Sequence, residues 1–473
     1  MEGHELASSH STNTMGDFST EQKVNEVNSF EEIKNVSVDK GILSEDNIDF
    51  PEGGFQGWLT TFGSFCGLIA VFGIENVTGI FEEYLQTHQL AEVNSSKIGW
   101  IFSIFPFICS VSGIFSGIYF DRNGFKKIVI IGTILHVGGL FAMANSAKYW
   151  HFILSFSIIC GFGNGLALSP LIICPSHYFK RRRGLAIACG NLGSCIGGGV
   201  FPFLLRRLFR MTSDENAYYG FQWGIRVLAF INLTLLIISI VCAKERLSYA
   251  AELKGSKFIE RFKKVSKIYA LQSFDAKGLV EPLFLSCVVG FALCDTCLNV
   301  ATTYFTTYAT TRGISASDSK NLVSVMNFCS IPGSLIPGML CDVFGRFNIM
   351  IGTMIALTLL IFVGWLPFAK SLASFYVISA LFGYLQGTIY SLLVVCCGQV
   401  SKTTDFGKRY ATSNLIASGT ILYAVPIAGA IIGSGSHRGY ENYIVYCGVL
   451  AIAGGIAMFV TRIIAVGFTW KKY

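Results

Sequence analysis

Charged side chains are scarce in this sequence. Of its 473 residues only 14% are Asp, Glu, Lys or Arg, whereas 52% are hydrophobic. A soluble domain usually carries about 25% charged residues. The scarcity of charge argues against an ordinary soluble enzyme, and the abundance of apolar residues excludes a chain that is disordered throughout.

The first 52 residues lack any long apolar run. They hold 12 Asp and Glu against 3 Lys, while the rest of the chain holds 17 acidic and 33 basic residues. Neither the basic start nor the apolar stretch of a secretory signal is present, so we expect the first membrane segment to act as its own insertion signal. We predict that residues 1–57 form a disordered acidic cytosolic tail, either a solvated leader or a regulatory segment.

Apolar runs of about 20 residues, each long enough to span a bilayer as a helix, recur from Trp58 onward. They lie at 58–80, 98–118, 127–147, 152–174, 184–205, 224–243, 281–303, 319–340, 349–369, 372–397, 409–433 and 441–465. The short alternating segments of a membrane β-barrel are not found. The runs therefore predict an all-α membrane protein with twelve transmembrane helices.

Lys and Arg are distributed unevenly between the connecting loops. With an inside N-terminus, the cytosolic loops hold 20 of them and the outside loops hold 9. Basic residues accumulate on the cytosolic side of membrane proteins. We therefore expect both termini to be cytosolic, and we expect the basic stretch 244–280, partly helical over 258–270, to be a cytosolic linker.

Two motifs recur in the second half of the sequence at almost one offset. The glycines and the amide of Gly161-Phe-Gly-Asn164-Gly165 return 222 residues later in Gly383-Tyr-Leu-Gln386-Gly387. The loop residues Gly117, Asp121 and Gly124 recur 221 residues later as Gly338, Asp342 and Gly345, and each loop also carries an arginine, Arg122 or Arg346. Such a duplication is typical of transporters that rock two bundles about a central site. It predicts two pseudo-symmetric six-helix bundles, 58–243 and 281–465, and a short cytosolic tail at 466–473.

The first loop motif, Gly117-x-x-x-Asp121-Arg122-x-Gly124-x-Lys-Lys, resembles the signature loop of the major facilitator superfamily. The resemblance implies the major facilitator fold and transport by alternating access. We expect Asp121 to accept hydrogen bonds from the start of a helix in the other half, near Gly407 to Arg409. Because those contacts would exist in only one access state, the eight loop residues are our candidates for conformational gating.

A narrower resemblance rests on Pro51-Glu-Gly-Gly-Phe-Gln-Gly-Trp58 and on Tyr178-Phe-Lys-Arg-Arg-Arg-Gly-Leu-Ala186. Both stretches are similar to motifs of the monocarboxylate-transporter-like family. Longer strings, such as Cys160-Gly-Phe-Gly-Asn-Gly165 and Phe362-Val-Gly-Trp-Leu-Pro-Phe368, resemble its fungal branch, which contains a plasma-membrane riboflavin transporter. The resemblance implies riboflavin uptake at the plasma membrane.

Two cations of the carboxylate-carrying members are missing from this sequence. Their Lys in the first segment corresponds to Glu75, and the eighth segment has no Arg beside Pro332. An anion in a dry cavity needs a compensating cation. This absence disfavours a proton-coupled monocarboxylate transporter, which stays the alternative together with carriers of other organic solutes.

Ionisable residues inside membrane spans are candidates for function because burying their charge is costly. Glu75 and Asp295 occupy comparable positions in the two halves, and protonation would remove that cost, so either could bind substrate or a proton. His136 is interpreted as a packing residue. The polar and aromatic candidates for substrate binding are Asn164, Asn299, Asn327, Tyr384, Gln386 and Tyr390.

Other classes of function find little support in the sequence. Neither a nucleotide-binding loop, a nucleophile elbow nor a metal-ligand spacing is found, so we expect no enzyme, no cofactor and no metal. Cys294-x-x-Cys297 lies in an apolar run, where small buried side chains are the better interpretation. A non-transporting nutrient sensor remains a less favoured alternative. We expect a monomer in the lipid bilayer, a small solute as ligand, protons as a further candidate, and no nucleic acid.

Overall fold

The computed structural model describes residues 50–210, 217–246, 274–433 and 435–468. Most of the expected acidic tail and the expected helix at 258–270 lie outside the described residues. Residues Phe50–Gly53 lead directly into the first helix, which begins at Gly54, three residues before the expected end of the tail.

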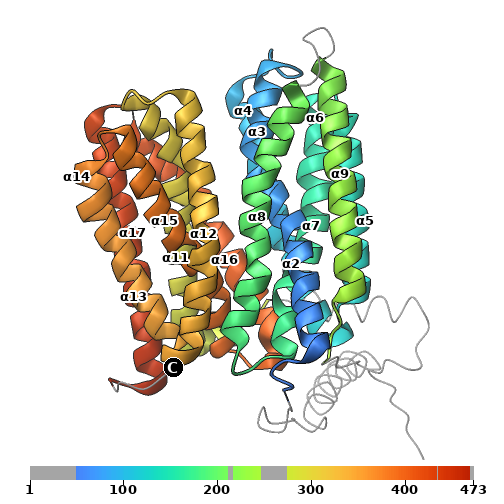
Figure 1. Ribbon diagram of the computed structural model, residues 1–473, viewed down its shortest axis with the longest axis vertical. Helices are drawn as coiled ribbons and strands as arrows, with labels where there is room; N and C mark the ends of the chain where they lie inside the picture. The colour runs from blue at the N-terminus through green and yellow to red at the C-terminus, as the bar shows by residue number, and fades with distance from the viewer. Residues whose placement is uncertain (1–49, 211–216, 247–273, 434, 469–473) are drawn as a thin grey trace, which may run out of the picture. The chain divides into compact units, whose positions relative to one another are not determined.

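Six spans make up the N-terminal bundle of the described chain (Figure 1). In order they are α2 (Gly54–Asn76) with α3 (Thr78–Thr87); α4 (Ser95–Asn123); α5 (Lys126–Ala144); α6 (Tyr149–Phe152) with η2 (Ile153–Cys160), α7 (Gly161–Ile173) and η3 (Cys174–His177); α8 (Arg183–Arg210); and α9 (Ala217–Cys242).

Six further spans make up the C-terminal bundle. In order they are α11 (Pro282–Thr311), preceded by η5 (Gly278–Val280); α12 (Ala316–Phe344); α13 (Arg346–Leu359) with η6 (Leu360–Trp365) and α14 (Leu366–Phe368); α15 (Leu372–Gln399); α16 (Phe406–Ile432), preceded by η7 (Thr403–Asp405); and α17 (His437–Val466). Twelve helices of the described chain are long and apolar enough to cross a membrane. The prediction of an all-α protein with twelve spans is confirmed.

Within each bundle, glycines allow two helices to cross with their backbones in contact. A Cβ atom on Gly165 of α7 would collide with the carbonyl oxygen of Cys109 in α4. In the second half, a Cβ on Gly383 or Gly387 of α15 would collide with the carbonyl oxygens of Met326 and Ser330 in α12. The repeated glycine motif thus builds the same close crossing twice, as small residues do where helices meet in lipid.

Aromatic side chains fill the interior of both bundles. In the first, the ring of Phe156 stacks on Phe105 at 4.6 Å and meets Phe81 edge-on. In the second, the fully buried Trp365 meets the ring of Phe305 edge-on at 5.1 Å. Each bundle therefore contains ring-to-ring contacts of its own, which help to hold its helices together.

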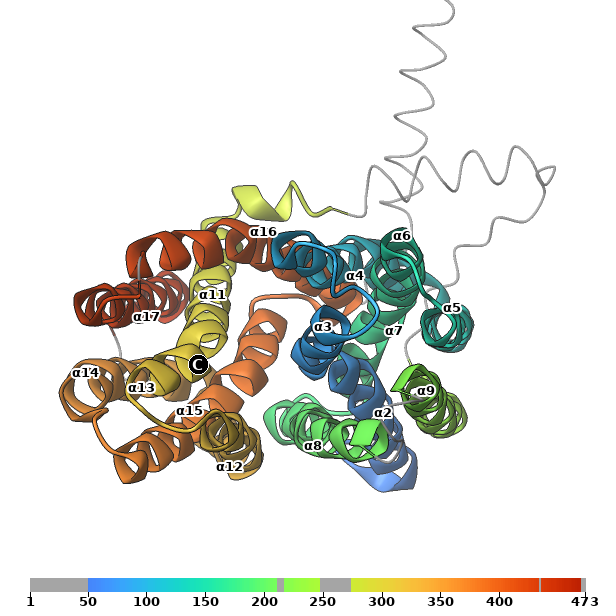
Figure 2. The same ribbon diagram turned by 90° about the horizontal axis from the view of Figure 1, so that it is seen from above.

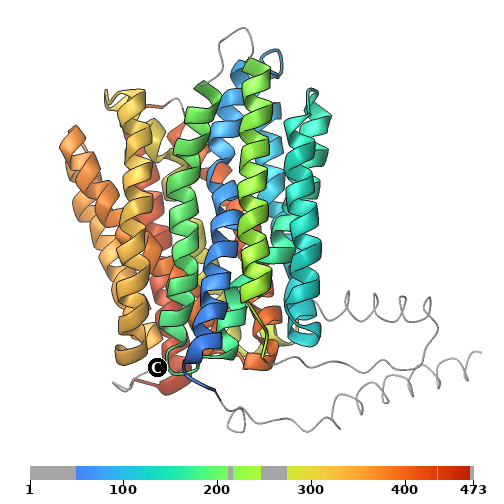
Figure 3. The same cartoon turned by 45° about the vertical axis from the view of Figure 1, so that its right-hand side comes forward.

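The two bundles meet mainly along two pairs of helices, with smaller contacts between α8 and α15 and between α7 and α16. Helix α4 packs against α16 on one side, and α8 packs against α12 on the other (Figure 2). In the N-terminal bundle the axes of the long helices lie roughly parallel to one another, with α9 in front in Figure 3. The bundles approach each other most closely at the end where the C-terminus is marked in Figure 1. We call this the closed end.

Two neighbouring glycines of α5 test the importance of close helix crossing. A Cβ on Gly139 would meet the backbone of Cys160 at 2.6 Å, whereas a Cβ on Gly138 meets nothing within 4 Å. We expect Gly139→Ala to destabilise the protein by about 1–3 kcal/mol through overpacking. Thermal unfolding of the detergent-solubilised protein measures the effect.

Gly138→Ala is the matched control, and we expect it to leave stability unchanged or to raise it by up to about 1 kcal/mol. Equal melting temperatures for the two variants would contradict the packing argument.

Candidate substrate cavity and gate

A cavity of about 350 Å³ lies between the two bundles, within the size range of small-molecule sites. Eight helices line it, four from each bundle: α2, α4, α7, α8, α11, α12, α15 and α16. The polar groups on its wall are carboxyls, amides, hydroxyls and thiols that project from otherwise apolar helices. Such a chamber, shared equally by two repeated bundles, is the arrangement expected of a secondary transporter.

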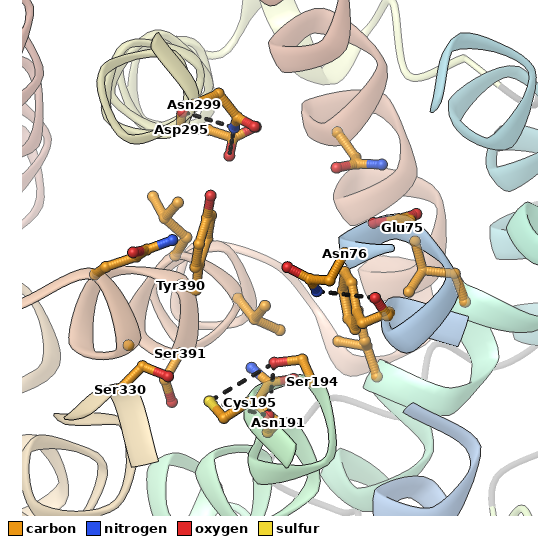
Figure 4. Close-up of a pocket in the computed structure, with 18 of the residues that line it drawn as sticks. Glu75, Asn76, Asn191, Ser194, Cys195, Asp295, Asn299, Ser330, Tyr390 and Ser391 are labelled. Atoms are coloured by element: carbon orange, nitrogen blue, oxygen red, sulfur yellow. Dashed lines mark hydrogen bonds between the residues drawn. The ribbon is translucent and has the colours of Figure 1, made fainter. Parts of the chain in front are cut away.

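Glu75 reaches the cavity from α2 (Figure 4). Its Oε1 accepts a hydrogen bond of 3.1 Å from the Nδ2 of Asn164 in α7, and the Cys109 thiol of α4 donates to the same oxygen at 3.6 Å. Asn164 itself is fully buried and does not line the cavity. The Asn164 amide therefore orients the Glu75 carboxyl from behind.

Asp295 faces the cavity from α11, on the side opposite Glu75 (Figure 4). The Nδ2 of Asn299, one turn further along, donates to its Oδ1 at 3.0 Å. The ring of Tyr390 projects from α15 into the cavity, on the side nearer Asp295 (Figure 4). A solute in the cavity thus meets an aromatic face and, on opposite walls, two carboxyls.

The structure brings six of the eight sequence-predicted binding residues to the cavity wall. These are Glu75, Asp295, Asn299, Asn327, Gln386 and Tyr390. Asn164 lies behind Glu75, and Tyr384 lies on α15 away from the lining. His136 is buried in α5 with its Nδ1 3.6 Å from the Cys160 sulfur, away from the cavity.

Several lining residues were not predicted from the sequence. Asn191, Ser194 and Cys195 of α8 form one polar wall of the cavity (Figure 4). The remaining polar groups that were missed are Asn76, Cys109, Ser110, Thr302, Ser330, Ser334, Ser391, Tyr410, Asn414 and Ser418. An amide within a predicted span, such as Asn191 or Asn414, was a usable signal, because a polar group in lipid needs a partner.

The described lining residues include no Lys, Arg or His. Glu75 and Asp295 are the ionisable carboxyls of this lining, and both bring negative rather than positive charge when ionised. No three His, Cys, Asp or Glu side chains of the described chain come together as a metal site requires. The chemistry of this wall suits a solute rich in hydrogen-bond donors rather than an anion.

Asp121 and Asp342 tie the two bundles together at the closed end. Asp121, near the end of α4, accepts hydrogen bonds of 3.0 and 2.9 Å from the backbone N–H groups of Gly407 and Lys408, where α16 begins. Asp342, near the end of α12, accepts bonds of 3.0 Å from Gly184 and Leu185, where α8 begins. Each carboxylate thus occupies the positive end of a helix in the opposite bundle, as expected for Asp121 from the sequence.

Glycines make the same contacts possible. A Cβ on Gly117 would collide with the carbonyl oxygen of Gly407, and a Cβ on Gly338 would collide with the side chain of Ala188. Gly124 and Gly345 end α4 and α12 with φ of +86° and +99°, values that favour glycine. In both halves, the duplicated loop motif therefore supplies a glycine for close approach to the opposite bundle and a glycine that ends the helix.

Arginines add contacts around these carboxylates. Arg183 Nη1 donates to the carbonyl of Gly398 at 2.9 Å, and its Nη2 donates to the hydroxyl of Thr403 at 3.0 Å. Arg346 donates to the carbonyl of Lys180 at 2.8 Å and lies 3.7 Å from Asp342. Arg122, beside Asp121, is half-buried. That these residues gate the transport cycle stays a prediction.

Comparison with known proteins agrees with this architecture. Residues 63–325 match the Major Facilitator Superfamily. The chain is 50% identical over 437 residues to the riboflavin transporter MCH5 of Saccharomyces cerevisiae, covering 92% of this chain and 84% of that protein. It is 32% identical over 424 residues to the MFS transporter asaE of Aspergillus flavus, covering 89% of this chain and 90% of that protein.

Solved structures share the fold. The proton:xylose symporter XylE superposes with a TM-score of 0.63 at 14% sequence identity, covering 86% of this chain and 94% of that one. The transporter FucP in its outward conformation superposes with a TM-score of 0.61 at 14% identity, covering 85% of this chain and 98% of that one.

The fold and the cavity define a multi-pass membrane transporter of a small solute. The chain belongs to the Major Facilitator Superfamily. The predictions of the major facilitator fold, of a transporter rather than an enzyme, and of a fungal riboflavin-transporter relative are confirmed.

Asp121→Asn tests the contact between α4 and α16. An amide side chain has a single acceptor oxygen, so one of the two backbone N–H groups at Gly407 and Lys408 loses its partner. A hydrogen bond to a charged group contributes about 1.5–3 kcal/mol. We expect amide hydrogen exchange in a peptide covering these residues to become roughly tenfold faster, as measured by mass spectrometry.

Asp405→Asn is the matched control. Asp405 directly precedes α16, but it is exposed and its side chain does not cap the helix. We expect exchange in the same peptide to be unchanged in this variant. An unchanged rate in Asp121→Asn would mean that its carboxylate does not hold the start of α16.

Proposed function

We propose that the protein takes up riboflavin across the plasma membrane by alternating access. The observation that carries this proposal is the composition of the cavity wall, which joins Tyr390 and Tyr410 to amides and two carboxyls, with no cation among the described lining residues. The 50% identity to a riboflavin transporter supports the same substrate.

The chemistry of the isoalloxazine ring fits this wall. The ring is planar and largely uncharged, and it presents amide-type donors and acceptors along one edge. Tyr390, Tyr410 and Phe291 offer aromatic faces, and Asn191, Asn327 and Gln386 offer amides. The ribityl hydroxyls can donate to Glu75 and Asp295, which accept hydrogen bonds when ionised.

A monocarboxylate is a poorer match for the same cavity. Its carboxylate would enter a wall that already carries Glu75 and Asp295, and the described lining offers no cation to compensate it. Burying like charges together is unfavourable. The cavity therefore favours riboflavin over lactate or pyruvate.

The transport cycle follows from the two bundles. We infer that the bodies 58–243 and 281–465 rock about the cavity, and that the closed end faces the cytosol, because the basic loops and Phe50 lie at that end. Both termini are then cytosolic, 244–280 serves as the linker and 466–473 as a tail. A single chain supplies the whole cavity wall, so we propose a monomer as the functional unit.

Uptake of radiolabelled riboflavin by cells deficient in riboflavin uptake tests the substrate. We expect cells that express this protein to accumulate riboflavin, and labelled lactate to be taken up no faster than by control cells. The Tyr390→Ala variant, which loses the aromatic face, should raise the half-saturating riboflavin concentration roughly tenfold, since base–aromatic stacking contributes about 1–3 kcal/mol.

The abundance of each variant at the cell surface is measured in parallel. Absence of riboflavin uptake at every pH would remove riboflavin as the substrate, and rapid lactate uptake would restore the monocarboxylate alternative.

Protons are a proposed second ligand. We propose that Asp295 binds a proton during the cycle, with Glu75 as the equivalent group in the other half. Both carboxyls lie within membrane spans, where an ionised group is costly once the cavity closes. Protonation neutralises the group and turns it from a pure acceptor into a donor.

Asp295→Asn tests this role because its amide mimics the neutral acid. In wild type we expect uptake to rise as the external pH falls and to decrease with a protonophore. In Asp295→Asn we expect uptake to lose both dependences. Radiolabelled uptake between about pH 5 and pH 8 measures the effect.

Glu441→Gln is the control, because this carboxyl is exposed near the start of α17, away from the cavity. We expect it to behave as wild type. Identical pH profiles for Asp295→Asn and wild type would exclude the proton role of Asp295.

A further inference from the structure

The loop before α8 and the first turn of α8 carry a row of backbone N–H groups that point at carboxylates. Five of the six N–H groups from Lys180 to Leu185 donate to a carboxylate oxygen. The last two donate to Asp342 of the opposite bundle, as described above. The first three donate to a carboxylate of the same bundle, Glu52.

Glu52 lies two residues before α2. Its Oε1 accepts hydrogen bonds from the N–H groups of Lys180 at 2.9 Å and Arg181 at 2.6 Å, and its Oε2 accepts one from Arg182 at 3.2 Å. Its own N–H donates to the carbonyl of Tyr178 at 3.1 Å. These four bonds fix the segment directly before α8 to the segment directly before α2.

The backbone at Glu52 is strained. Among the non-glycine residues that the structure describes, Glu52 alone has a positive φ, of +52°. Such a conformation persists only where surrounding contacts determine it. The three bonds to its carboxylate provide such contacts, so the position of this side chain is strongly determined.

Asp275 makes comparable contacts in the second bundle. It lies before α11, and it accepts hydrogen bonds from Lys408 Nζ at 2.7 Å and from Arg409 Nε at 3.2 Å, both in the first turn of α16. Its N–H donates to the hydroxyl of Thr412 at 3.0 Å. Burial works to raise the pKa of Asp275, but the hydrogen bond and charge of Lys408 outweigh it and hold that pKa below its ordinary value. The group therefore stays ionised at physiological pH.

Glu52 and Asp275 occupy equivalent places in the repeat. They are 223 residues apart, close to the offsets of 221 and 222 between the repeated motifs. Each precedes the first helix of its bundle, and each holds the start of the fifth, α8 or α16. The start of α8 also binds Asp342 of the opposite bundle, and the start of α16 binds Asp121.

We propose that Glu52 and Asp275 are a matched pair of positioning residues for the gate. Each holds the start of one gate helix at the position where its N–H groups meet Asp342 or Asp121. The proposal rests on the opening of the closed end in the transport cycle proposed above. When the bundles part there, the bonds of Glu52 and Asp275 remain, because both partners belong to one bundle, and the helix start stays ready to receive the Asp again.

Cys341 is a native reporter of opening at this end. Its thiol is fully buried in α12, and a Cβ on Gly184 of α8 would collide with its sulfur. We expect a membrane-impermeant maleimide to label Cys341 roughly five to ten times faster in Glu52→Gln and in Asp275→Asn than in wild type. The full chain is labelled in lipid nanodiscs, and peptide mass spectrometry quantifies each cysteine.

Two internal controls and three further variants separate gating from general loosening. Cys160 and Cys447 are fully buried inside the first and the second bundle, and their labelling should stay unchanged. Glu281→Gln removes an exposed carboxylate that also binds Arg409, at 2.7 Å, and it should label as wild type. Glu52→Asp and Asp275→Glu keep the charge and should return labelling toward the wild-type rate.

Three results would overturn the proposal. They are a wild-type labelling rate at Cys341 in both neutral variants, faster labelling in only one of them, and equally faster labelling at Cys160 and Cys447. If Glu52→Gln or Asp275→Asn is too unstable to purify, Glu52→Asp or Asp275→Glu is labelled in its place. Faster labelling of Cys160 or Cys447 in that variant would contradict the proposal. Labelling needs no substrate, so failure of wild type to take up riboflavin contradicts the proposed substrate and leaves this test intact.

Discussion

A carboxylate from one bundle bound at the start of a helix in the other is the contact on which the described conformation depends. The first N–H groups of a helix have no partner within the helix. At α12, α15 and α17 a serine directly before the helix supplies one. At α8 and α16 the partner is Asp342 or Asp121 from the opposite bundle. A serine cap lies within one bundle and needs no contact between bundles, whereas the caps of α8 and α16 require the two bundles to meet at the closed end.

The contacts of the proposed gate are symmetric, whereas the cavity is not. They repeat because Asp121 and Asp342 each accept hydrogen bonds at the start of a helix in the opposite bundle, with Gly117 and Gly338 allowing the close approach. Within the bundles the glycines at 165 and 387 also perform one task, the close crossing of two helices. The amides beside them have diverged, since Asn164 is buried behind Glu75 whereas Gln386 lines the cavity. A carrier with a symmetric gate can therefore acquire an asymmetric ligand wall without loss of its cycle.

The spans, the repeat and the contact of Asp121 were predictable because apolar length and short motifs are local patterns of the sequence. Which face of a span lines the cavity was less predictable. Polar side chains are spread around helix α15, so its sequence did not separate Tyr390, which lines the cavity, from Tyr384, which does not. Glu52 was assigned to the tail because its role depends on residues about 130 positions away, which the local sequence does not show.

The charge of the wall has a consequence for the proposed cycle. While the cavity is open, water can solvate Glu75 and Asp295, but closure around an empty cavity removes that water and leaves two carboxyls with few donors. The amides of Asn164 and Asn299 satisfy each only in part. A donor-rich solute or a proton supplies what is missing, whereas an anion adds to the deficit. In the proposed cycle the same two groups would select the solute and prevent the empty carrier from closing, which would give specificity and coupling one physical origin.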